Sequence, residues 1–252
     1  GPELMMHMQE QATKFGARVE YKKVDSVQKK EHGFSILCGD QEYESETVIV
    51  ATGAAPRHLG LEGEEKLIGH GLTSCATCDG AFFRNQHVAI VGGGDTAMEE
   101  ATFLTKFASK VTVIHRRDEL RASKAMQSRA FANEKIEFMW NSEVEGVLGD
   151  QVVEGITVKN RNTGELTTLE DVTGLFVAIG HKPNTDLFKG VLSMDEVGYI
   201  QTKGQSTKTD LDGVFACGDA MDSVYRQAVT AAGTGCKAAL DAEHYLTELE
   251  LA

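Results

Sequence analysis

Two cysteines three positions apart are the residues of this sequence best suited to chemistry. Cys75 and Cys78 flank Ala76 and Thr77, and Asp79 follows directly. Two intervening residues permit a small disulfide ring whose thiols can have different pKa values, as reversible dithiol exchange requires. A carboxylic acid beside a thiolate can carry its proton. The spacing therefore predicts a redox-active pair at Cys75 and Cys78, with Asp79 as the proton carrier.

Other interpretations of the pair are zinc binding, structural burial and a thioredoxin fold. Half of a zinc site would need a second C-x-x-C, and the other cysteines stand singly. Two inert buried thiols are disfavoured by the adjacent carboxylate. A thioredoxin fold has no need of a nucleotide-binding loop, and a loop of that kind begins 14 positions after Cys78. We predict no metal site, and structural roles for Cys38, Cys217 and Cys236.

That loop lies between an apolar strand pattern and a helical pattern. Gly92, Gly94 and Ala97 match the form G-x-G-x-x-G/A directly after the apolar run 88–91. The first glycine permits a tight turn, the second leaves a bare backbone for a pyrophosphate, and the small third residue allows close helix packing. The alternative is an ordinary strand-turn-helix corner. The dinucleotide-binding residues predicted here are Gly92, Gly93, Gly94, Asp95 and Thr96.

Basic residues follow the next strand pattern. His115 comes 21 positions after Gly94, close to where an NAD site places a carboxylate on the ribose hydroxyls. That carboxylate is absent, and Arg116, Arg117 and Arg121 offer planar donors suited to a 2′-phosphate. A solvated basic patch is the alternative, but this offset in an acidic chain favours a phosphate site. The sequence therefore predicts NADP rather than NAD.

A further glycine turn lies near the C-terminal end, after the short apolar run 214–217. Glycine and aspartate follow this run, and a helix of small residues begins soon afterwards. Such a turn can hold a polar cofactor arm and bring helix amides to a ring system or phosphate. A capped helix with Asp219 or Asp222 at its N-cap is the alternative, and both remain open. The candidate residues are Gly218, Asp219, Arg226, Gln227 and Ala228.

Buried strands and helices must position these residues. The β-branched runs 48–51, 88–91 and 175–179 each end close to a glycine, and residues 96–108 have helical spacing of apolar side chains. This alternation predicts an α/β fold with parallel sheets and crossover helices. Antiparallel hairpins are expected from residues 19–27 with 33–37 and from residues 155–161 with 165–169.

A repeated motif predicts two related units joined by two chain crossings. The strand-then-glycine pattern at 48–53 recurs at 175–180, and Pro56 or Pro183 follows each copy. We therefore expect crossings near residues 54–60 and 180–188. The middle segment is then one domain inserted into a second domain made of both chain ends. The predicted segments are residues 1–56, 57–184 and 185–252.

The composition excludes several classes of protein. The chain has 252 residues and 41% hydrophobic residues, which suits a globular protein with a large core. Its net charge of −13 repels nucleic acid and anionic membrane surfaces. No apolar run approaches the length of a membrane span, and the first ten residues lack the pattern of a signal peptide. We expect a cytoplasmic location and neither a nucleic-acid nor a membrane partner.

Taken together, these residues closely resemble the low-molecular-weight thioredoxin reductases, flavoproteins that pass electrons from NADPH through FAD and a C-A-T-C disulfide to thioredoxin. The resemblance runs essentially from end to end, with several independent motifs in family order. The matching motifs are Ala51-Thr52-Gly53, Cys75 to Gly80, Gly92 to Ala97, His115-Arg116-Arg117, Gly180-His181-Lys182-Pro183-Asn184, and Gly218-Asp219 through Arg226-Gln227-Ala228.

The resemblance implies two Rossmann-like domains of the glutathione-reductase type, with the NADPH domain at 57–184 inserted into an FAD domain. The resemblance makes Thr52, Gly53 and Gly180 cofactor-binding residues, together with the turn near the C-terminal end. Cys78 would face the flavin, Cys75 would attack the partner's disulfide, and Asp79 would serve as acid and base. Thioredoxin would be the partner of a homodimeric enzyme, and the inserted domain would rotate about the two crossings.

One departure from the family concerns the start of the chain. The family begins with its own strand and G-x-G-x-x-G loop for the FAD pyrophosphate, and nothing similar precedes the first residues here. We therefore expect the chain to lack roughly the first βαβ element. Two alternatives follow from the resemblance. One is the reductase of a peroxidase system, which the C-A-T-C form disfavours, and the other is an inactive NADP-binding fragment.

Overall fold

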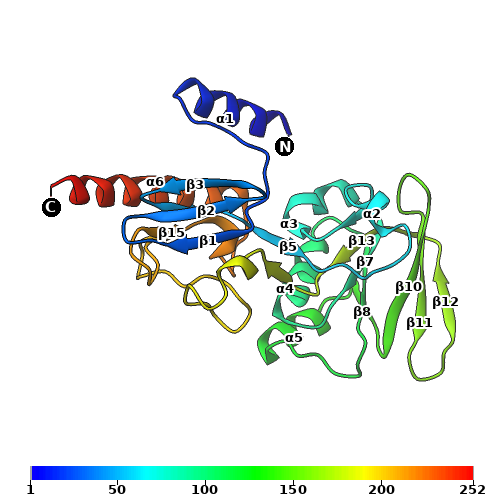
Figure 1. The fold of residues 1–252 in the computed structure, drawn as a ribbon. Coiled ribbons are helices and arrows are strands. Elements are labelled where there is room, and N and C mark those ends of the chain that lie inside the picture. Colours follow the sequence, from blue (N-terminus) through cyan, green and yellow to red (C-terminus); the bar gives the residue numbers. More distant parts are fainter. Residues whose placement is uncertain (1, 252) are drawn as a thin grey trace. The chain divides into compact units, whose positions relative to one another are not determined.

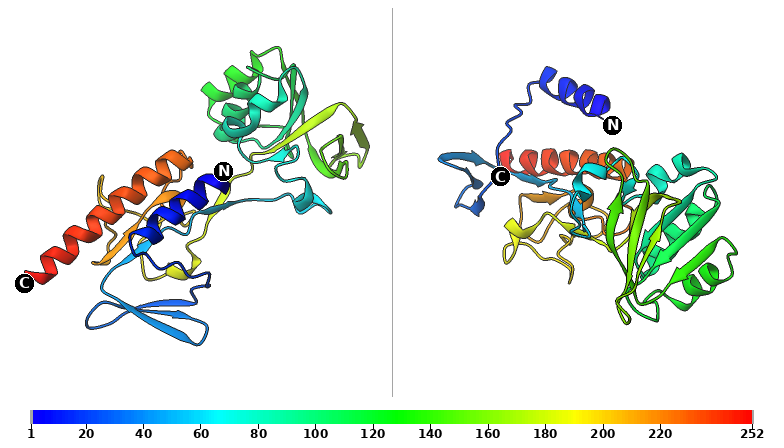
Figure 2. Two further views of the ribbon diagram at one scale, coloured as in Figure 1. Left: turned by 90° about the horizontal axis from the view of Figure 1, so that it is seen from above. Right: turned by 90° about the vertical axis from the view of Figure 1, so that its right-hand side faces the viewer.

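The computed structural model describes residues 2–251, which form two compact units (Figures 1 and 2). Unit 1 comprises the chain up to Ala54 and again from Pro183, and unit 2 comprises Ala55–Lys182. The chain therefore passes between the units twice. Strands β5 (Ala54–Pro56) and β14 (His181–Pro183) lie at these crossings and pair with one another.

Unit 2 is built on a five-stranded parallel sheet with the order β6-β13-β7-β8-β9, of which Figure 1 labels β13, β7 and β8. Its central strands are short apolar runs buried on both faces, as the sequence predicts for a parallel sheet. The α/β fold class is thus confirmed. The strands are β6 (Leu72–Thr73), β13 (Val172–Val177), β7 (His87–Val91), β8 (Lys110–Ile114) and β9 (Ile136–Met139).

Helices α4 (Asp95–Leu104) and α5 (Lys124–Phe131) contact one another, and α4 also contacts β7 and β8. The predicted helix 96–108 is too long at its C-terminal end, because α4 ends at Leu104. The chain turns after Leu104, while Ala108 still packs into the core that α4 shares with the sheet. The helical spacing of apolar residues therefore continues past the end of the helix, because Ala108, which follows the turn, is also buried.

A small antiparallel sheet completes unit 2. It contains β10 (Ser142–Leu148), β11 (Gly155–Asn160) and β12 (Leu166–Leu169) in that order. The hairpin of β11 and β12 confirms the prediction, and β10 was not predicted. Its register shifts between Val144 and Gly146, so its apolar residues do not keep a strict alternation.

Unit 1 contains an antiparallel sheet of β1 (Ser26–Lys29), β2 (Phe34–Cys38) and β3 (Gln41–Ser45). The predicted strand 19–27 is wrong over most of its length, because residues 19–25 form no strand and are exposed. A parallel pair, β4 (Val48–Val50) with β15 (Val214–Ala216), lies beside the long helix α6 (Ala228–Glu250). The core of this unit includes Phe34, Val50 and Phe188.

The remaining helices are short, apart from α1 (Pro2–Lys14), none of whose residues is buried. Between residues 2 and 251, no helix combines the length and the apolar character needed to cross a bilayer. The short helices are α2 (Glu64–Leu67), α3 (Ala76–Asp79), η1 (Gly80–Phe83), η2 (Asp186–Phe188) and η3 (Gly218–Ala220).

Candidate active site and nucleotide site

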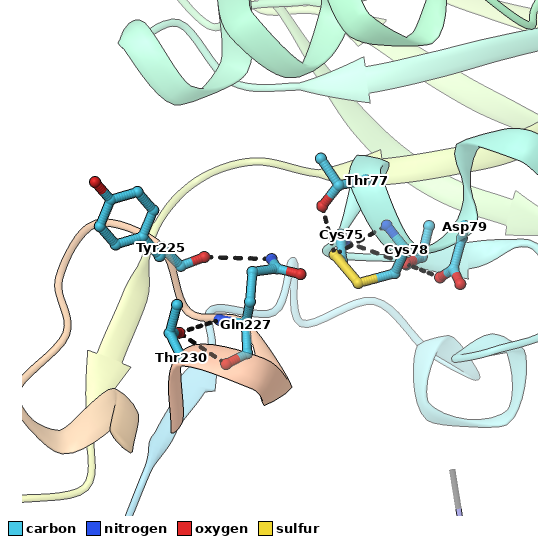
Figure 3. Close-up of a disulfide and its surroundings, with 8 residues drawn as sticks. Cys75, Thr77, Cys78, Asp79, Tyr225, Gln227 and Thr230 are labelled. Carbon is cyan, nitrogen blue, oxygen red and sulfur yellow. Dashed lines mark hydrogen bonds between the residues drawn. A yellow bond between two sulfur atoms is a disulfide. The ribbon is translucent and has the colours of Figure 1, made fainter. Parts of the chain in front are cut away.

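A disulfide joins Cys75 to Cys78 at the start of α3 (Figure 3). Cys75 is the N-cap residue of α3, and its sulfur accepts a hydrogen bond from the backbone N–H of Cys78 at 3.3 Å. Cys75 is half-buried, and Cys78 is exposed within its unit. After reduction, the same N–H would stabilise a thiolate on Cys75.

A threonine hydroxyl connects the disulfide loop to the carboxylate of Asp79. Thr73, buried at the end of β6, donates from Oγ1 to Oδ2 of Asp79 at 2.5 Å. Oγ1 of Thr73 also accepts the backbone N–H of Cys75 at 3.2 Å. Thr73 was not predicted from the sequence, because the role of its hydroxyl depends on the turn between β6 and α3. This network holds the carboxylate close to the loop that carries the sulfurs.

Close packing explains two of the glycines between β7 and α4. A Cβ atom on Gly92 would lie 2.5 Å from the backbone oxygen of Ala178 and 2.6 Å from Cβ of Ala97. A Cβ atom on Gly93 would lie 2.2 Å from the ring of His115. Gly94 differs, because a Cβ there would meet no atom within 4 Å. Gly94 is thus not required for packing, which leaves its bare backbone available for a ligand.

A cavity of about 510 Å³ lies at the carboxyl ends of β7, β8 and β13 in unit 2. It brings together six of the predicted residues. Gly94, Asp95 and Thr96 are not among its lining residues, and the carboxylate of Asp95 instead accepts the backbone N–H of Ser123 at 2.8 Å. The predicted residues that line the cavity are Gly92, Gly93, His115, Arg116, Arg117 and Arg121.

The imidazole of His115 is buried beneath this cationic cavity. Its Nε2 atom lies 3.0 Å from the backbone oxygen of Glu119. Burial lowers the pKa of His115, and the guanidinium groups of Arg121 and Arg116 lower it further, although hydrogen bonds to backbone groups act in the opposite direction. His115 is therefore neutral at pH 7, so the positive charge of this region comes from the arginines.

Two basic residues of the cavity lining were not predicted from the sequence. Arg57 and His58 follow β5 directly and line the same cavity. The backbone N–H of Arg57 donates to the oxygen of Gly180 at 3.0 Å, and this bond holds the segment beside the end of β13. Gly180 itself has a φ of 101°, which favours glycine, and it supports the cavity wall rather than lining it.

The predicted residues of unit 1 gather at one edge of the β4 and β15 pair. Val50 and Ala216 are register partners, and the strands are parallel, so both strands end at the same edge. Thr52 and Gly53 follow β4, and Gly218 and Asp219 follow β15. Burial raises the pKa of the Asp219 carboxyl, and the negative charge of Asp222 raises it further.

The turn before α6 is held by the carboxylate of Asp222. It accepts the backbone N–H groups of Val224, Tyr225 and Arg226 at 2.8–3.0 Å. Burial acts to raise the pKa of Asp222, but these hydrogen bonds lower it overall. Gln227, drawn in Figure 3, is the N-cap residue of α6. Neither Asp219 nor Asp222 caps α6, so that alternative was wrong.

Comparison with known proteins identifies the class. The family model for pyridine nucleotide-disulphide oxidoreductases matches residues 2–235. The chain is 54% identical to the thioredoxin reductase of Mycolicibacterium smegmatis, over 98% of this chain and 79% of the relative. It is 52% identical to the bifunctional thioredoxin reductase/thioredoxin of Mycobacterium leprae, over 98% of this chain and 54% of the relative.

Solved structures give the same result. The thioredoxin reductase of Streptococcus pyogenes MGAS5005 aligns with a TM-score of 0.92 and 43% identity, over 98% of this chain and 81% of that one. The chain belongs to the thioredoxin reductases of the pyridine nucleotide-disulphide oxidoreductase family, and it is shorter than these relatives. The predicted family and its two-domain, Rossmann-type fold are confirmed.

The cofactors of this family are FAD and NADPH, and the residues of both units fit them. In unit 2, the open face of Gly94 suits a pyrophosphate and the three arginines suit a 2′-phosphate. In unit 1, the carboxyl group of Asp219 can accept hydrogen bonds from hydroxyl groups of FAD. Backbone N–H groups in the first turn of α6 can face oxygen atoms of the same cofactor.

The glycine loop permits a prediction that separates ligand binding from folding. Gly94→Ala adds a methyl group to open space at a φ of −95°, so we expect an unchanged melting temperature. Because that methyl group would occupy the approach of the pyrophosphate, the Kd for NADPH should rise about tenfold or more. Gly93→Ala should instead destabilise the fold by about 1–3 kcal/mol, because its methyl group overlaps the His115 ring. Thermal melts and NADPH titrations measure both effects, and wild-type affinity in Gly94→Ala would contradict the pyrophosphate site.

Proposed function

We propose that this chain is a thioredoxin-disulfide reductase that takes electrons from NADPH, through FAD and the Cys75–Cys78 disulfide, to thioredoxin. One observation carries the proposal. A disulfide supported by a carboxylate and a glycine-loop cavity with three arginines are built on the same parallel sheet of unit 2. The disulfide provides the electron acceptor, and the cavity provides the site of the electron donor.

NADPH binds in unit 2, which corresponds to the expected domain 57–184. Arg116, Arg117 and Arg121 bind its 2′-phosphate, while Gly92, Gly93 and Gly94 with Asp95 and Thr96 lie along the pyrophosphate. FAD binds in unit 1, made of the expected segments 1–56 and 185–252. Gly180 lies at a crossing. The FAD-binding residues are Thr52, Gly53, Gly218, Asp219, Arg226, Gln227 and Ala228.

The chemistry at the sulfurs balances with one NADPH and one proton. FAD, held by the residues of unit 1, would supply the capacity to take a hydride from NADPH and to pass on an electron pair. That pair breaks the bond between Cys75 and Cys78, and two protons complete the two thiols. One of these protons comes from the hydride of NADPH, which is a proton plus an electron pair, and the other comes from solvent. The carboxylate of Asp79 carries a proton to or from the sulfurs.

The dithiol then reduces thioredoxin in two exchanges. The thiolate of Cys75 attacks the disulfide of thioredoxin, which forms a mixed disulfide and releases one thioredoxin thiol. Cys78 then attacks the sulfur of Cys75, so that the intrachain disulfide forms again and the second thioredoxin thiol leaves. The hydrogen bond from the Cys78 N–H supports Cys75 as the attacking thiolate.

Thioredoxin docks beside the disulfide. A cavity of about 670 Å³ in unit 2 is lined by Asp79, Phe82 and Phe83, among other residues, and Phe82 is 76% exposed. An exposed aromatic residue four positions after Cys78 provides the type of anchor that carries much of the energy of a protein interface.

Replacing Phe82 tests this docking site. We expect Phe82→Ala to raise the KM for thioredoxin about tenfold with little change in the Kd for NADPH, because an interfacial aromatic anchor contributes about 1–2 kcal/mol or more. Phe131→Ala, at another exposed aromatic residue of the same unit, is the matched control. An equal KM for wild type and Phe82→Ala would contradict docking at this cavity.

Helix α1 supports a homodimer. Its apolar side chains are exposed. Leu4, Met5 and Met8 share one face of the helix, because Met8 follows the other two by four and three positions. We expect the chain to have the mass of a dimer in light scattering, and Leu4→Glu with Met8→Glu to give monomers. A monomeric wild type would contradict this proposal.

We also propose a reducing, cytoplasmic compartment, because Cys38, Cys217 and Cys236 are free thiols.

A steady-state assay tests the function. The purified chain, supplied with FAD, should show flavin absorbance and should oxidise NADPH over many turnovers only when thioredoxin is present. An inactive NADP-binding fragment would bind NADPH and give no turnover. A flavin-loaded chain that does not reduce thioredoxin would contradict the proposed substrate.

A further inference from the structure

The carboxylate of Glu64 is buried in unit 2 and is used by neither the disulfide nor the glycine loop. Glu64 is the first residue of α2, and only 3% of it is exposed. Its oxygens accept the backbone N–H groups of Leu59, Gly60 and Leu61 at 2.9, 2.7 and 3.1 Å. Burying a carboxylate is costly unless its oxygens are hydrogen-bonded, so these three bonds account for its burial.

The three N–H groups belong to residues 57–61, which we call the strap. Arg57 ties one end of the strap to Gly180 through a backbone hydrogen bond of 3.0 Å. Glu64 holds the other end, where Leu59 and Leu61 also pack against a buried apolar cluster. The side of the strap that begins with Arg57 and His58 lines the nucleotide cavity. Nδ1 of His58 lies 3.7 Å from Oε1 of Glu64.

The sheet order places the strap on one side of the glycine loop. The strap is bonded to Gly180, after β13, whereas Arg116 and Arg117 follow β8. Strand β7, which leads into the glycine loop, lies between β13 and β8. Because neighbouring strands are about 4.8 Å apart, the strap and the arginines flank the loop at a separation on the order of 10 Å. A dinucleotide with its 2′-phosphate on the arginines and its pyrophosphate at the loop therefore extends toward the strap.

We propose that Glu64 is a positioning residue for NADPH. It fixes the strap so that Arg57 and His58 bind the nicotinamide half of the dinucleotide, beyond the pyrophosphate. This inference rests on the proposed binding of NADPH in unit 2. Arg57 supplies a permanent cation and planar donors suited to the ribose oxygens next to the diphosphate. Without the Glu64 carboxylate, three backbone donors lose their acceptor and the two side chains lose their fixed position.

Glu64→Gln tests the role with little change in shape. The amide keeps one acceptor oxygen and turns an N–H₂ group toward backbone donors. We expect the Kd for NADPH, measured by titration of nucleotide fluorescence, to rise about tenfold. The Kd for NADH should rise by the same factor, because the 2′-phosphate site is untouched. Glu65→Gln is the matched control, since it removes the same charge from the exposed neighbouring position of α2 and should change neither affinity.

A double-mutant cycle separates positioning from a general effect on the fold. If Glu64 acts through the strap, adding Glu64→Gln to the variant Arg57→Ala/His58→Ala should cause no further loss of NADPH affinity. A full tenfold loss in that background would overturn the proposal, as would wild-type affinity in Glu64→Gln or an equal loss in Glu65→Gln.

A second variant serves if Glu64→Gln fails to fold. Gly60 has a φ of 78° and open space around it, so Gly60→Ala strains the strap without a clash and leaves the carboxylate intact. Gly60→Ala should also weaken NADPH binding in the otherwise wild-type chain. In the Arg57→Ala/His58→Ala background it should cause no further loss. Unchanged binding in Gly60→Ala would overturn the proposal. Failure of the wild type to bind NADPH would instead refute the proposed function itself.

Discussion

Cys78→Ser is expected to abolish thioredoxin turnover, with a loss of about a thousandfold or more, while the Kd for NADPH stays unchanged. Loss of a reacting side chain typically has an effect of at least this size, and here the disulfide that accepts the electron pair can no longer form. The cavity for NADPH is built from other residues of unit 2, so nucleotide binding should not depend on this sulfur. Steady-state NADPH oxidation with thioredoxin, alongside an NADPH titration, measures both quantities.

The same variant tests the roles of the two sulfurs. With Cys78 replaced, Cys75 can still attack the disulfide of thioredoxin, but nothing resolves the product. A stable mixed disulfide with thioredoxin should therefore accumulate in the reduced Cys78→Ser variant. Cys236→Ser is the control, because Cys236 is an exposed single cysteine of α6 and should be replaceable without loss of turnover. Substantial turnover by Cys78→Ser, or failure to trap thioredoxin on Cys75, would contradict these roles.

Removal of two arginines is expected to eliminate the preference for NADPH over NADH. In Arg116→Ala/Arg117→Ala, the Kd for NADPH should rise about a hundredfold or more, because each charge-assisted hydrogen bond to a phosphate contributes about 1.5–3 kcal/mol. The Kd for NADH should change little, because NADH has no 2′-phosphate. Parallel titrations with both nucleotides measure the ratio.

Arg129→Ala is a matched control for this effect. Arg129 lies in the last turn of α5 and is not among the residues that line the cavity. Its replacement should alter neither affinity. Neutral His115 supplies no charge at pH 7, so the preference in the wild type should be nearly constant above that pH. An equal loss of NADH and NADPH affinity in the double variant would show that the arginines support the fold rather than recognise the 2′-phosphate.

Much of unit 2 could be predicted from sequence because its motifs are local. An apolar strand run, a glycine turn and the start of a helix follow one another at Val88–Ala97, so the glycine loop is encoded in ten consecutive residues. The pair Cys75 and Cys78 is similarly local. Prediction failed where the relevant neighbour is distant in sequence. Arg57 lines the cavity because its backbone bonds to Gly180, and no spacing rule contains that contact.

The missed strands have a different cause. β3 reads Gln41–Ser45 and is exposed or half-exposed throughout, so it has no buried face that would produce an apolar alternation. β10 has a register shift that interrupts its pattern. Residues 19–25 contain apolar residues at strand-like spacing, yet they form no strand. In each case, hydrophobic pattern and hydrogen-bonded pairing are separate properties, and the sequence reveals only the first.

The most direct test follows the electrons to the sulfurs. The FAD-supplied chain is mixed with NADPH under anaerobic conditions, its thiols are alkylated, and the modified peptides are identified by mass spectrometry. Two new thiols, at Cys75 and Cys78, should be labelled in proportion to the NADPH consumed, while labelling of Cys38, Cys217 and Cys236 stays unchanged. A disulfide that remains intact while NADPH is oxidised would contradict electron transfer from NADPH to this pair.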